Sequence, residues 1–312
     1  MLNSRRASID DASEQPILFV PARGRQDRTS CGSRRHAVSR CFSAFVALAC
    51  ALSLTACVSD TASEEITVAG STTCLPIAEI GAEQFGETND VDVLISGLGS
   101  SAGIEAVSNG TADIATSSRG LTADEQQLGL VPSVMAHDGI AIIVSVDNPI
   151  NNLSVEQLRD IYSGKITNWS EVGGNDVEIQ LVNRDEASGT REAFNSIVMQ
   201  GTPFDRSAAV LPGTGQVRDV VSRSEGAIGY ISMGFVDSKF ASTSVKAISI
   251  NGVVPTEESV ASGEYPISRD LYFFTKGNPT GAAADYIAYI QSEEMDGLIR
   301  EAGFVPVENV AE

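Results

Sequence analysis

Three short segments rich in Gly, Ser and Thr have the composition of a small-anion site. They are Gly70-Ser71-Thr72-Thr73, Gly99-Ser100-Ser101 and Ser188-Gly189-Thr190. The first two directly follow apolar runs, the third follows one after a short polar loop, and each leads into a segment with helical periodicity. A helix start presents unpaired amide hydrogens and a positive dipole end, to which Ser and Thr add hydroxyl donors. With Arg184 just before the third segment, the pattern predicts a pocket for a tetrahedral oxyanion.

Strand and helix patterns alternate along the chain around these segments. Residues 66–69 and 139–146 are apolar runs typical of buried strands, and residues 75–86 have helical periodicity. Ser154 starts a further helix with Gln157 at the capping-box position. Such alternation is typical of an α/β protein in which helices cover both faces of mostly parallel sheets.

The donor segments are far apart in the sequence, which bears on domain organisation. Two of them precede Val146 and the third comes well after it. If all three contact one anion, the site must lie between two lobes. We therefore predict one lobe from residues 66–145 plus 232–312, and a second lobe from residues 146–231.

The N-terminal region has the pattern of an export signal. Residues 41–56 are apolar and uncharged, and Arg34, Arg35 and Arg40 precede them. This apolar run is too short to favour a membrane-spanning helix. We therefore expect the mature protein to be extracytoplasmic.

The apolar run ends in Leu54-Thr55-Ala56-Cys57, which resembles the lipobox of bacterial lipoproteins. That resemblance implies removal of residues 1–56 and lipidation of Cys57, with residues 57–65 as a tether at the cell membrane. The alternative is an ordinary secretory signal in which the cysteine occurs by chance.

The charge balance excludes some partners. The chain has 21 basic and 41 acidic residues, and without residues 1–56 it would keep 13 and 37. Such an acidic surface argues against nucleic acid or an anionic membrane surface as partner, so local donors must hold an anion. Cys74 alone would remain beside Cys57, and no Cys/His cluster has metal-ligand spacing, so we expect neither a disulfide framework, a metal nor a cofactor.

Several segments together resemble the phosphate-binding lipoproteins of Pst-type ABC transporters. The segments are residues 70–76, 97–119, 137–144, 158–174, 183–194 and 225–233. Each motif alone is weak, but their order and spacing are specific and run from about Ile66 to Val307. The resemblance implies a two-lobe periplasmic-binding-protein fold of type 2. In this fold mixed, mostly parallel sheets are flanked by helices, and the lobes close on a ligand in the cleft between them.

The resemblance also implies which residues bind the ligand. The residues that match the family's ligand motifs are Thr72, Thr73, Ser100, Arg184, Ser188, Gly189 and Thr190. Ser71 and Ser101 either contact the ligand or act as plain helix caps. The implied partners are inorganic phosphate and an ABC permease with a cytoplasmic ATPase. The protein is then expected to be a monomer that performs no chemistry.

One position departs from the family pattern. Ser118 stands where the best-described members have an Asp that accepts the proton of hydrogen phosphate. Sulfate carries no such proton at neutral pH, so loss of the Asp would remove a means of discrimination. We keep Ser118 as a ligand residue and hypothesise that Asp138 supplies the missing acceptor. The neighbouring Arg119 either contacts the ligand or pairs with an acidic residue.

Three other functions fit parts of the sequence. In the first, the pocket binds another tetrahedral oxyanion such as sulfate. In the second, the pocket belongs to a phosphate-sensing or adhesive surface lipoprotein that does not transport phosphate. A serine hydrolase is the third, because residues 99–103 formally match the Gly-x-Ser-x-Gly nucleophile elbow, with Ser101 at its centre. That enzyme would need a His after its acid, and no His follows His137.

Overall fold

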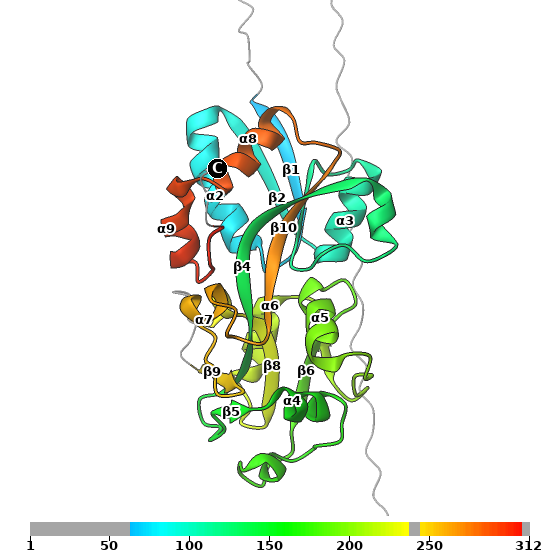
Figure 1. The fold of residues 1–312 in the computed structure, drawn as a ribbon, viewed down its shortest axis with the longest axis vertical. Coiled ribbons are helices and arrows are strands. Elements are labelled where there is room, and N and C mark those ends of the chain that lie inside the picture. The colour runs from blue at the N-terminus through cyan, green and yellow to red at the C-terminus, as the bar shows by residue number, and fades with distance from the viewer. Residues whose placement is uncertain (1–62, 237–243, 308–312) are drawn as a thin grey trace, which may run out of the picture. The chain divides into compact units, whose positions relative to one another are not determined.

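The computed structural model describes residues 63–236 and 244–307, which belong to one compact unit of the chain (Figure 1). The predicted signal at residues 1–56 and the lipidation site Cys57 lie outside the described residues, as does most of the predicted tether. The first strand begins at Glu64, so the last two residues of that tether are already part of the sheet.

The strands form one mixed sheet with the order β2-β1-β3-β10-β4-β8-β6-β7, and β9 pairs with both β4 and β5. The strands are β1 (Glu64–Gly70), β2 (Val91–Gly97), β3 (Ile114–Ser117), β4 (Leu130–Ser145), β5 (Asn152–Leu153), β6 (Gln180–Arg184), β7 (Ala209–Leu211), β8 (Ala227–Ser232), β9 (Val245–Ile250) and β10 (Ser268–Lys276). The α/β fold class is therefore confirmed, with a sheet that is mixed.

Strand β4 explains why the sheet is mixed. Its first part pairs antiparallel with β10, and its second part pairs antiparallel with β8 and β9. Figure 1 shows β4 running from one half of the fold into the other, with β10 beside it. The pairs that do not involve β4 or β10, such as β1 with β2 and β6 with β8, are parallel. The antiparallel pairs arise where the chain enters the second half and returns.

Helices cover both faces of this sheet. They are α2 (Leu75–Asn89), α3 (Ser100–Asn109), α4 (Val155–Tyr162), α5 (Gly189–Phe194), α6 (Thr214–Val221), α7 (Glu257–Ala261), α8 (Gly281–Ile290) and α9 (Glu293–Glu301). Shorter turns are the 3-10 segments Glu125–Leu128, Trp169–Val172 and Met233–Phe235 and the π-helical Asn195–Met199. The predicted capping box is confirmed at α4, where Ser154 Oγ accepts from the Gln157 amide and the Gln157 side chain accepts from the Ser154 amide.

The period of two along each strand divides the buried side chains between the faces. In β1, Val68 packs in a cluster with α2, α8 and α9, whereas its neighbour Ala69 packs in a cluster with α3. In β4, Ile142 packs with α4 and α5, whereas Ile143 packs with α6. Apolar residues on both faces of a strand are what the continuous apolar run at 139–146 predicts.

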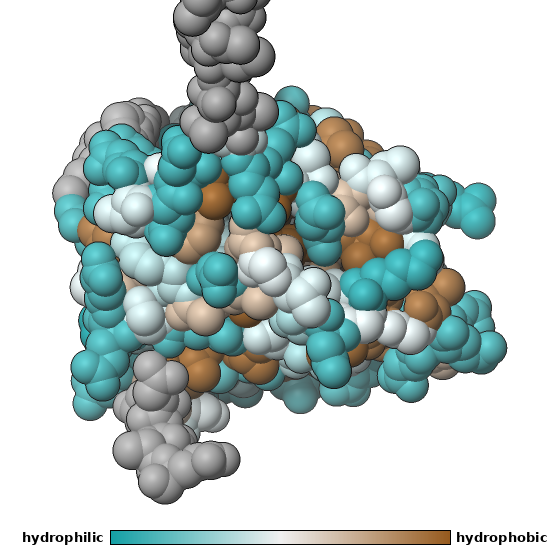
Figure 2. All heavy atoms as spheres, turned by 90° about the horizontal axis from the view of Figure 1, so that it is seen from above, coloured by the Kyte–Doolittle hydropathy of each residue, from teal (hydrophilic) through white to brown (hydrophobic). Residues whose placement is uncertain are grey.

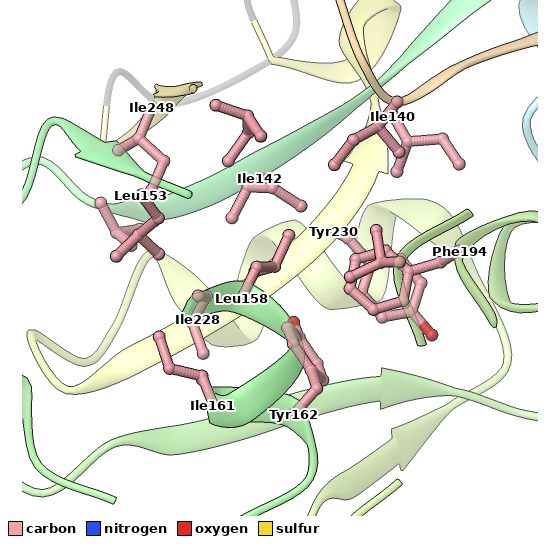
Figure 3. Packing of buried hydrophobic residues seen from close by; sticks show 14 of the residues in the cluster. Ile140, Ile142, Leu153, Leu158, Ile161, Tyr162, Phe194, Ile228, Tyr230 and Ile248 are labelled. Atoms are coloured by element: carbon pink, nitrogen blue, oxygen red, sulfur yellow. The ribbon is translucent and has the colours of Figure 1, made fainter. Parts of the chain in front are cut away.

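The core around Ile142 contains a close aromatic group (Figure 3). The rings of Phe194 and Tyr230 stack with centroids 4.2 Å apart and an interplanar angle of 8°. Ile248 and Ile267 belong to the same core. Because these two residues pack with the second half of the fold, we propose that the second lobe continues to about residue 267. The division into two lobes itself stays a proposal.

The face of the molecule seen from above is largely polar (Figure 2). Figure 2 shows hydrophilic residues over most of the face seen from above, with hydrophobic residues scattered between them. Larger exposed apolar side chains include Leu94 and Leu98, at and after the edge strand β2. None of the helices in the described part of the chain has the length and apolar character to cross a bilayer.

Candidate anion-binding site

The three donor segments occupy the positions that the sequence predicts. Gly70 ends β1 and the turn after it leads into α2, Gly99 is the N-cap residue of α3, and Ser188 is the N-cap residue of α5. Each segment therefore places backbone amides at the start of a helix, where they lack partners within the helix. The first two segments are also bonded to each other, because the amides of Leu98 and Gly99 both donate to the carbonyl of Gly70.

A cluster of buried serine hydroxyls joins the first two segments to the end of β3. Ser71 Oγ donates to Ser118 Oγ at 2.9 Å, and the hydroxyls of Ser118 and Ser100 are 3.3 Å apart. The amide of Ser118 also donates to Ser100 Oγ at 3.1 Å. All three side chains are buried. Ser118 therefore lies with Ser71 and Ser100, as the sequence predicts for residues of one site.

The third segment meets this hydroxyl cluster through Gly189. A Cβ atom added at Gly189 would lie 2.2 Å from Ser100 Oγ and 2.7 Å from Ser118 Oγ. Real Cβ atoms do not approach other atoms so closely, so the position requires a glycine. The backbone of Gly189 is consequently close to both serine hydroxyls, although the residues are more than 70 positions apart in the sequence.

Two threonine pairs complete the contact between the segments. The hydroxyl oxygens of Thr73 and Thr190 are 3.1 Å apart, and those of Thr72 and Thr214 are 3.0 Å apart. Thr73, Thr190 and Thr214 are buried. Thr214, the first residue of α6, is a site neighbour that sequence reasoning missed. The pair Gly213-Thr214 follows a short apolar run and would have been the signal for it.

Arg184 reaches the same place from the end of β6. Its side chain is 2% exposed. The guanidinium donates to the Leu211 and Pro212 carbonyls and to the hydroxyls of Thr214 and Thr72, at 2.8 to 3.3 Å. Within residues 63–236 and 244–307, no carboxylate forms an ion pair with it. Burial lowers the pKa of Arg184, and the nearby Asp185 carboxylate opposes this shift. Arg184 thus carries a buried charge whose direct partners are neutral.

Asp138 lies at the centre of β4 with both carboxylate oxygens engaged. Oδ1 accepts from Ser232 Oγ at 2.7 Å, and Oδ2 accepts from Nε and Nη2 of Arg269 at 3.0 and 2.8 Å. Burial raises the pKa of Asp138, while the charge of Arg269 and the Ser232 hydroxyl act in the opposite direction. A role for Asp138 as the acceptor of a phosphate proton stays a prediction.

Arg269 is the second residue that sequence reasoning missed. Its guanidinium also donates to the Ser118 carbonyl at 3.1 Å, and its Nη2 lies 3.5 Å from Thr73 Oγ1. The available signal was a basic residue two positions before the apolar residues Leu271–Phe274. That signal is weak, because basic residues flank many buried strands without contacting a site.

Two of the predicted ligand side chains have other partners. Ser188 Oγ accepts from the Arg191 amide at 3.2 Å and so caps α5, which leaves its backbone at the site. Ser101 Oγ accepts from Arg119 Nη2 at 3.0 Å. Arg119 in turn forms a bidentate ion pair with Glu125 at 2.6 and 2.9 Å, which selects the acidic-neighbour alternative for this arginine.

A groove of about 350 Å³ opens beside the site. Its lining comes from the loop after β3 and the first half of β10, and from α5 and the π-helical segment after it. Arg119, Arg269 and Tyr272 belong to the first of these two parts, and Glu192 and Ser196 belong to the second. The groove therefore gives solvent a route to the region of Arg269.

Comparison with known proteins agrees with this fold. Residues 56–294 match the PBP superfamily domain. The phosphate-binding protein PstS of Bacillus subtilis (strain 168) is 34% identical over 253 residues, which cover 79% of this chain and 82% of that protein. The chain is therefore a member of the PBP superfamily.

Solved structures make the assignment more specific. A putative phosphate ABC transporter substrate-binding protein with bound phosphate from Clostridium perfringens is 37% identical, with a TM-score of 0.74 over 78% of this chain and 100% of that one. An ABC-type phosphate transport receptor from Vibrio cholerae is 36% identical, with a TM-score of 0.66 and the same coverage. The chain belongs to the PstS-type phosphate-binding proteins.

Proposed function

We propose that this protein captures inorganic phosphate and delivers it to an ABC importer. The observation that carries the proposal is the environment of Arg184, a buried guanidinium with neutral direct partners beside three helix starts. A buried charge without a counter-charge is costly, and an anion held between these donors would supply one. Two of the similar proteins support phosphate as that anion, since one is named for binding it and the other is described with it bound.

The proposed ligand set is the one predicted from the sequence. It consists of Ser71, Thr72, Thr73, Ser100, Ser101, Ser118, Asp138, Arg184, Ser188, Gly189 and Thr190. Hydroxyls and amides of neutral residues provide most of the donors, and Arg184 provides a charge that can bond two phosphate oxygens at once. Ser188 and Gly189 would contribute through their backbone, given that the Ser188 hydroxyl caps α5.

The bonds between the proposed lobes indicate how binding would act on the conformation. Thr72 is bonded to Thr214 and to Arg184, and the Ser101 amide donates to the Ala187 carbonyl at 3.2 Å. Phosphate held by donors of both lobes would stabilise this closed arrangement over an open one. A membrane permease with a cytoplasmic ATPase would then recognise the closed, loaded form.

Calorimetry on protein stripped of bound ligand tests the proposal directly. We expect phosphate to bind with micromolar or tighter affinity, and sulfate, arsenate and molybdate serve as competitors of similar shape. Arg184→Ala should weaken phosphate binding at least about tenfold, or about 1.4 kcal/mol. The matched control is Arg300→Ala, because Arg300 is a surface arginine on α9. Wild-type protein that does not bind phosphate would refute the function. Tighter binding of sulfate than of phosphate would favour the alternative of a sulfate-binding protein.

Location and transport require their own tests. We propose that the protein is extracytoplasmic and anchored by a lipid on Cys57. Labelling of cells with a radioactive fatty acid should mark the wild-type protein and should fail to mark Cys57→Ala. Phosphate uptake should fall when the protein is removed, whereas a purely sensing or adhesive protein would leave uptake unchanged.

A further inference from the structure

Two guanidinium groups approach neighbouring threonines of the first donor segment. Arg184 Nη2 lies 3.3 Å from Thr72 Oγ1, and Arg269 Nη2 lies 3.5 Å from Thr73 Oγ1. The two arginines come from different parts of the chain, at the end of β6 and near the start of β10. Both side chains are buried, with relative exposures of 2% for Arg184 and 9% for Arg269.

The guanidinium groups of Arg184 and Arg269 are both buried and both positively charged, and they approach the same turn, so they repel each other. The positive charge of Arg269 is one of the influences on Arg184, whose pKa is lowered by burial and further lowered by that charge. Such an arrangement is unfavourable unless an anion lies between the charges. The Asp138 carboxylate faces Arg269 and lies outside ion-pair distance of Arg184, so it compensates one of the two guanidinium groups.

The position of Arg269 is fixed by the strands that join the two halves of the fold. Arg269 and Asp138 are directly opposite each other in the antiparallel pair of β10 and β4. The Asp138 carboxylate accepts two bonds from the guanidinium and a third from Ser232 at the end of β8. Because Nε and Nη2 of Arg269 both donate to Oδ2, and Ser232 holds Oδ1, this ion pair restricts the orientation of the planar guanidinium. One Arg269 nitrogen is left to reach the Ser118 carbonyl, and Nη2 points to Thr73.

We propose that Arg269 is a second cationic ligand of the oxyanion site, and that Asp138 and Ser232 position its guanidinium. This inference rests on the proposed function, since it names a further binding residue of the same site. In this inference Asp138 positions Arg269, and this role replaces the ligand role as proton acceptor that the sequence predicts for it. A pocket with two guanidinium groups and a carboxylate already bonded on both oxygens selects a tetrahedral dianion by charge and shape.

The two roles of Asp138 differ in their effect on selectivity. If Asp138 accepts the phosphate proton, Asp138→Asn weakens phosphate binding and relieves the repulsion of sulfate, so the ratio of the two affinities changes. If Asp138 positions Arg269, Asp138→Asn weakens both anions together and leaves the ratio within about threefold of wild type. Calorimetry with phosphate and with sulfate on full-length, ligand-stripped protein measures this ratio.

The binding role of Arg269 is tested in a background without an unpaired buried charge. In the double variant Arg269→Gln with Asp138→Asn, two amides replace the ion pair. We expect phosphate affinity to fall at least about tenfold. Arg269→Lys with Asp138 intact keeps the charge and should retain more affinity than the double variant. Arg300→Gln, at the surface, should bind like wild type. Wild-type affinity in the double variant would overturn the proposal, whereas wild-type protein that does not bind phosphate would refute the function itself.

A measurement on the wild-type chain keeps the proposal testable if the double variant does not fold. The Nε–H signals of ¹⁵N-labelled arginine side chains can be assigned by Lys variants and followed during a phosphate titration. The signals of Arg184 and Arg269 should both shift and saturate with the same midpoint, while that of Arg300 should stay in place. An Arg269 signal that does not respond to phosphate would refute its role as a ligand.

Discussion

Thr73 and Thr190 are 117 positions apart in the chain, yet their hydroxyl oxygens are 3.1 Å apart. Thr73 belongs to the turn between β1 and α2, and Thr190 belongs to the first turn of α5. Their contact joins the first and third donor segments, so neither proposed lobe holds the complete candidate site by itself. Predictions about this site therefore concern the contact between the segments as well as the individual donors.

Replacement of the Thr190 hydroxyl should weaken binding with little effect on the fold. Thr190→Val keeps the shape of the buried side chain and replaces its hydroxyl, a hydrogen-bond donor, with a methyl group. We expect phosphate affinity to fall by about tenfold to a hundredfold, which corresponds to the roughly 1.5–3 kcal/mol of a hydrogen bond to a charged group. Calorimetry measures the affinity, and Thr88→Val on the exposed side of α2 is the control. An unchanged affinity would mean that Thr190 Oγ1 does not contact the ligand.

Addition of one methyl group at Gly189 should disrupt the site. The Cβ of Gly189→Ala would lie 2.2 Å from Ser100 Oγ and 2.9 Å from Ser100 Cβ, so the serine side chains or the third segment must shift. We expect phosphate binding to be lost or reduced by more than about a hundredfold. Gly215→Ala is the matched control, because a Cβ at this position in α6 meets no atom within 4 Å. The control should bind normally and gain up to about 1 kcal/mol of stability. Normal binding by Gly189→Ala would contradict the observed approach of the segments.

The thiol of Cys74 should be unreactive in the folded protein. The side chain is fully buried, and burial raises the pKa of Cys74 to about 12, so almost no thiolate forms near neutral pH. With Ellman's reagent at pH 8, native wild type and native Cys74→Ser should release the same amount of product. After unfolding in guanidinium chloride, wild type should release one equivalent more. A difference between the native proteins would show that Cys74 is accessible.

The ion pair between Glu125 and Arg119 should make stability depend on pH in the acid range. Burial acts to raise the pKa of Glu125, but the Arg119 guanidinium and the Thr122 amide outweigh it and leave the pKa below its usual value. A carboxylate with a lowered pKa in the folded state stabilises the fold above its unfolded pKa of about 4.3, and this contribution is lost as the pH falls through the folded value.

Glu125→Gln should therefore lower the melting temperature at pH 7, and the difference from wild type should disappear as the pH falls from about 5 to below 3. Thermal unfolding followed by circular dichroism over this range provides the measurement. Glu87→Gln, at an exposed position of α2, is the control and should show no such trend. A difference that persists at the lowest pH would indicate that Glu125 acts through packing rather than charge.

Local sequence patterns predicted much of the fold. The capping box of Ser154 and Gln157 depends on residues three positions apart, and the structure confirms it. The donor segments at Gly99 and Ser188 likewise depend on a turn followed by a helix, which short stretches of sequence encode. The pairing of β9 with β4 and β5 could not be predicted in the same way, because it depends on contacts between distant residues.

The sequence by itself determined the positions of the three donor segments, the presence of Arg184 before the third, and the alternation of strands and helices. Only the tertiary structure decided that Arg269 lies beside Thr73 and that Asp138 is bonded to Arg269. The physical reason is that helix caps and turns form between residues close in the chain. The pairing of Arg269 with Asp138 depends instead on the register of two long strands, which the packing of the whole core fixes.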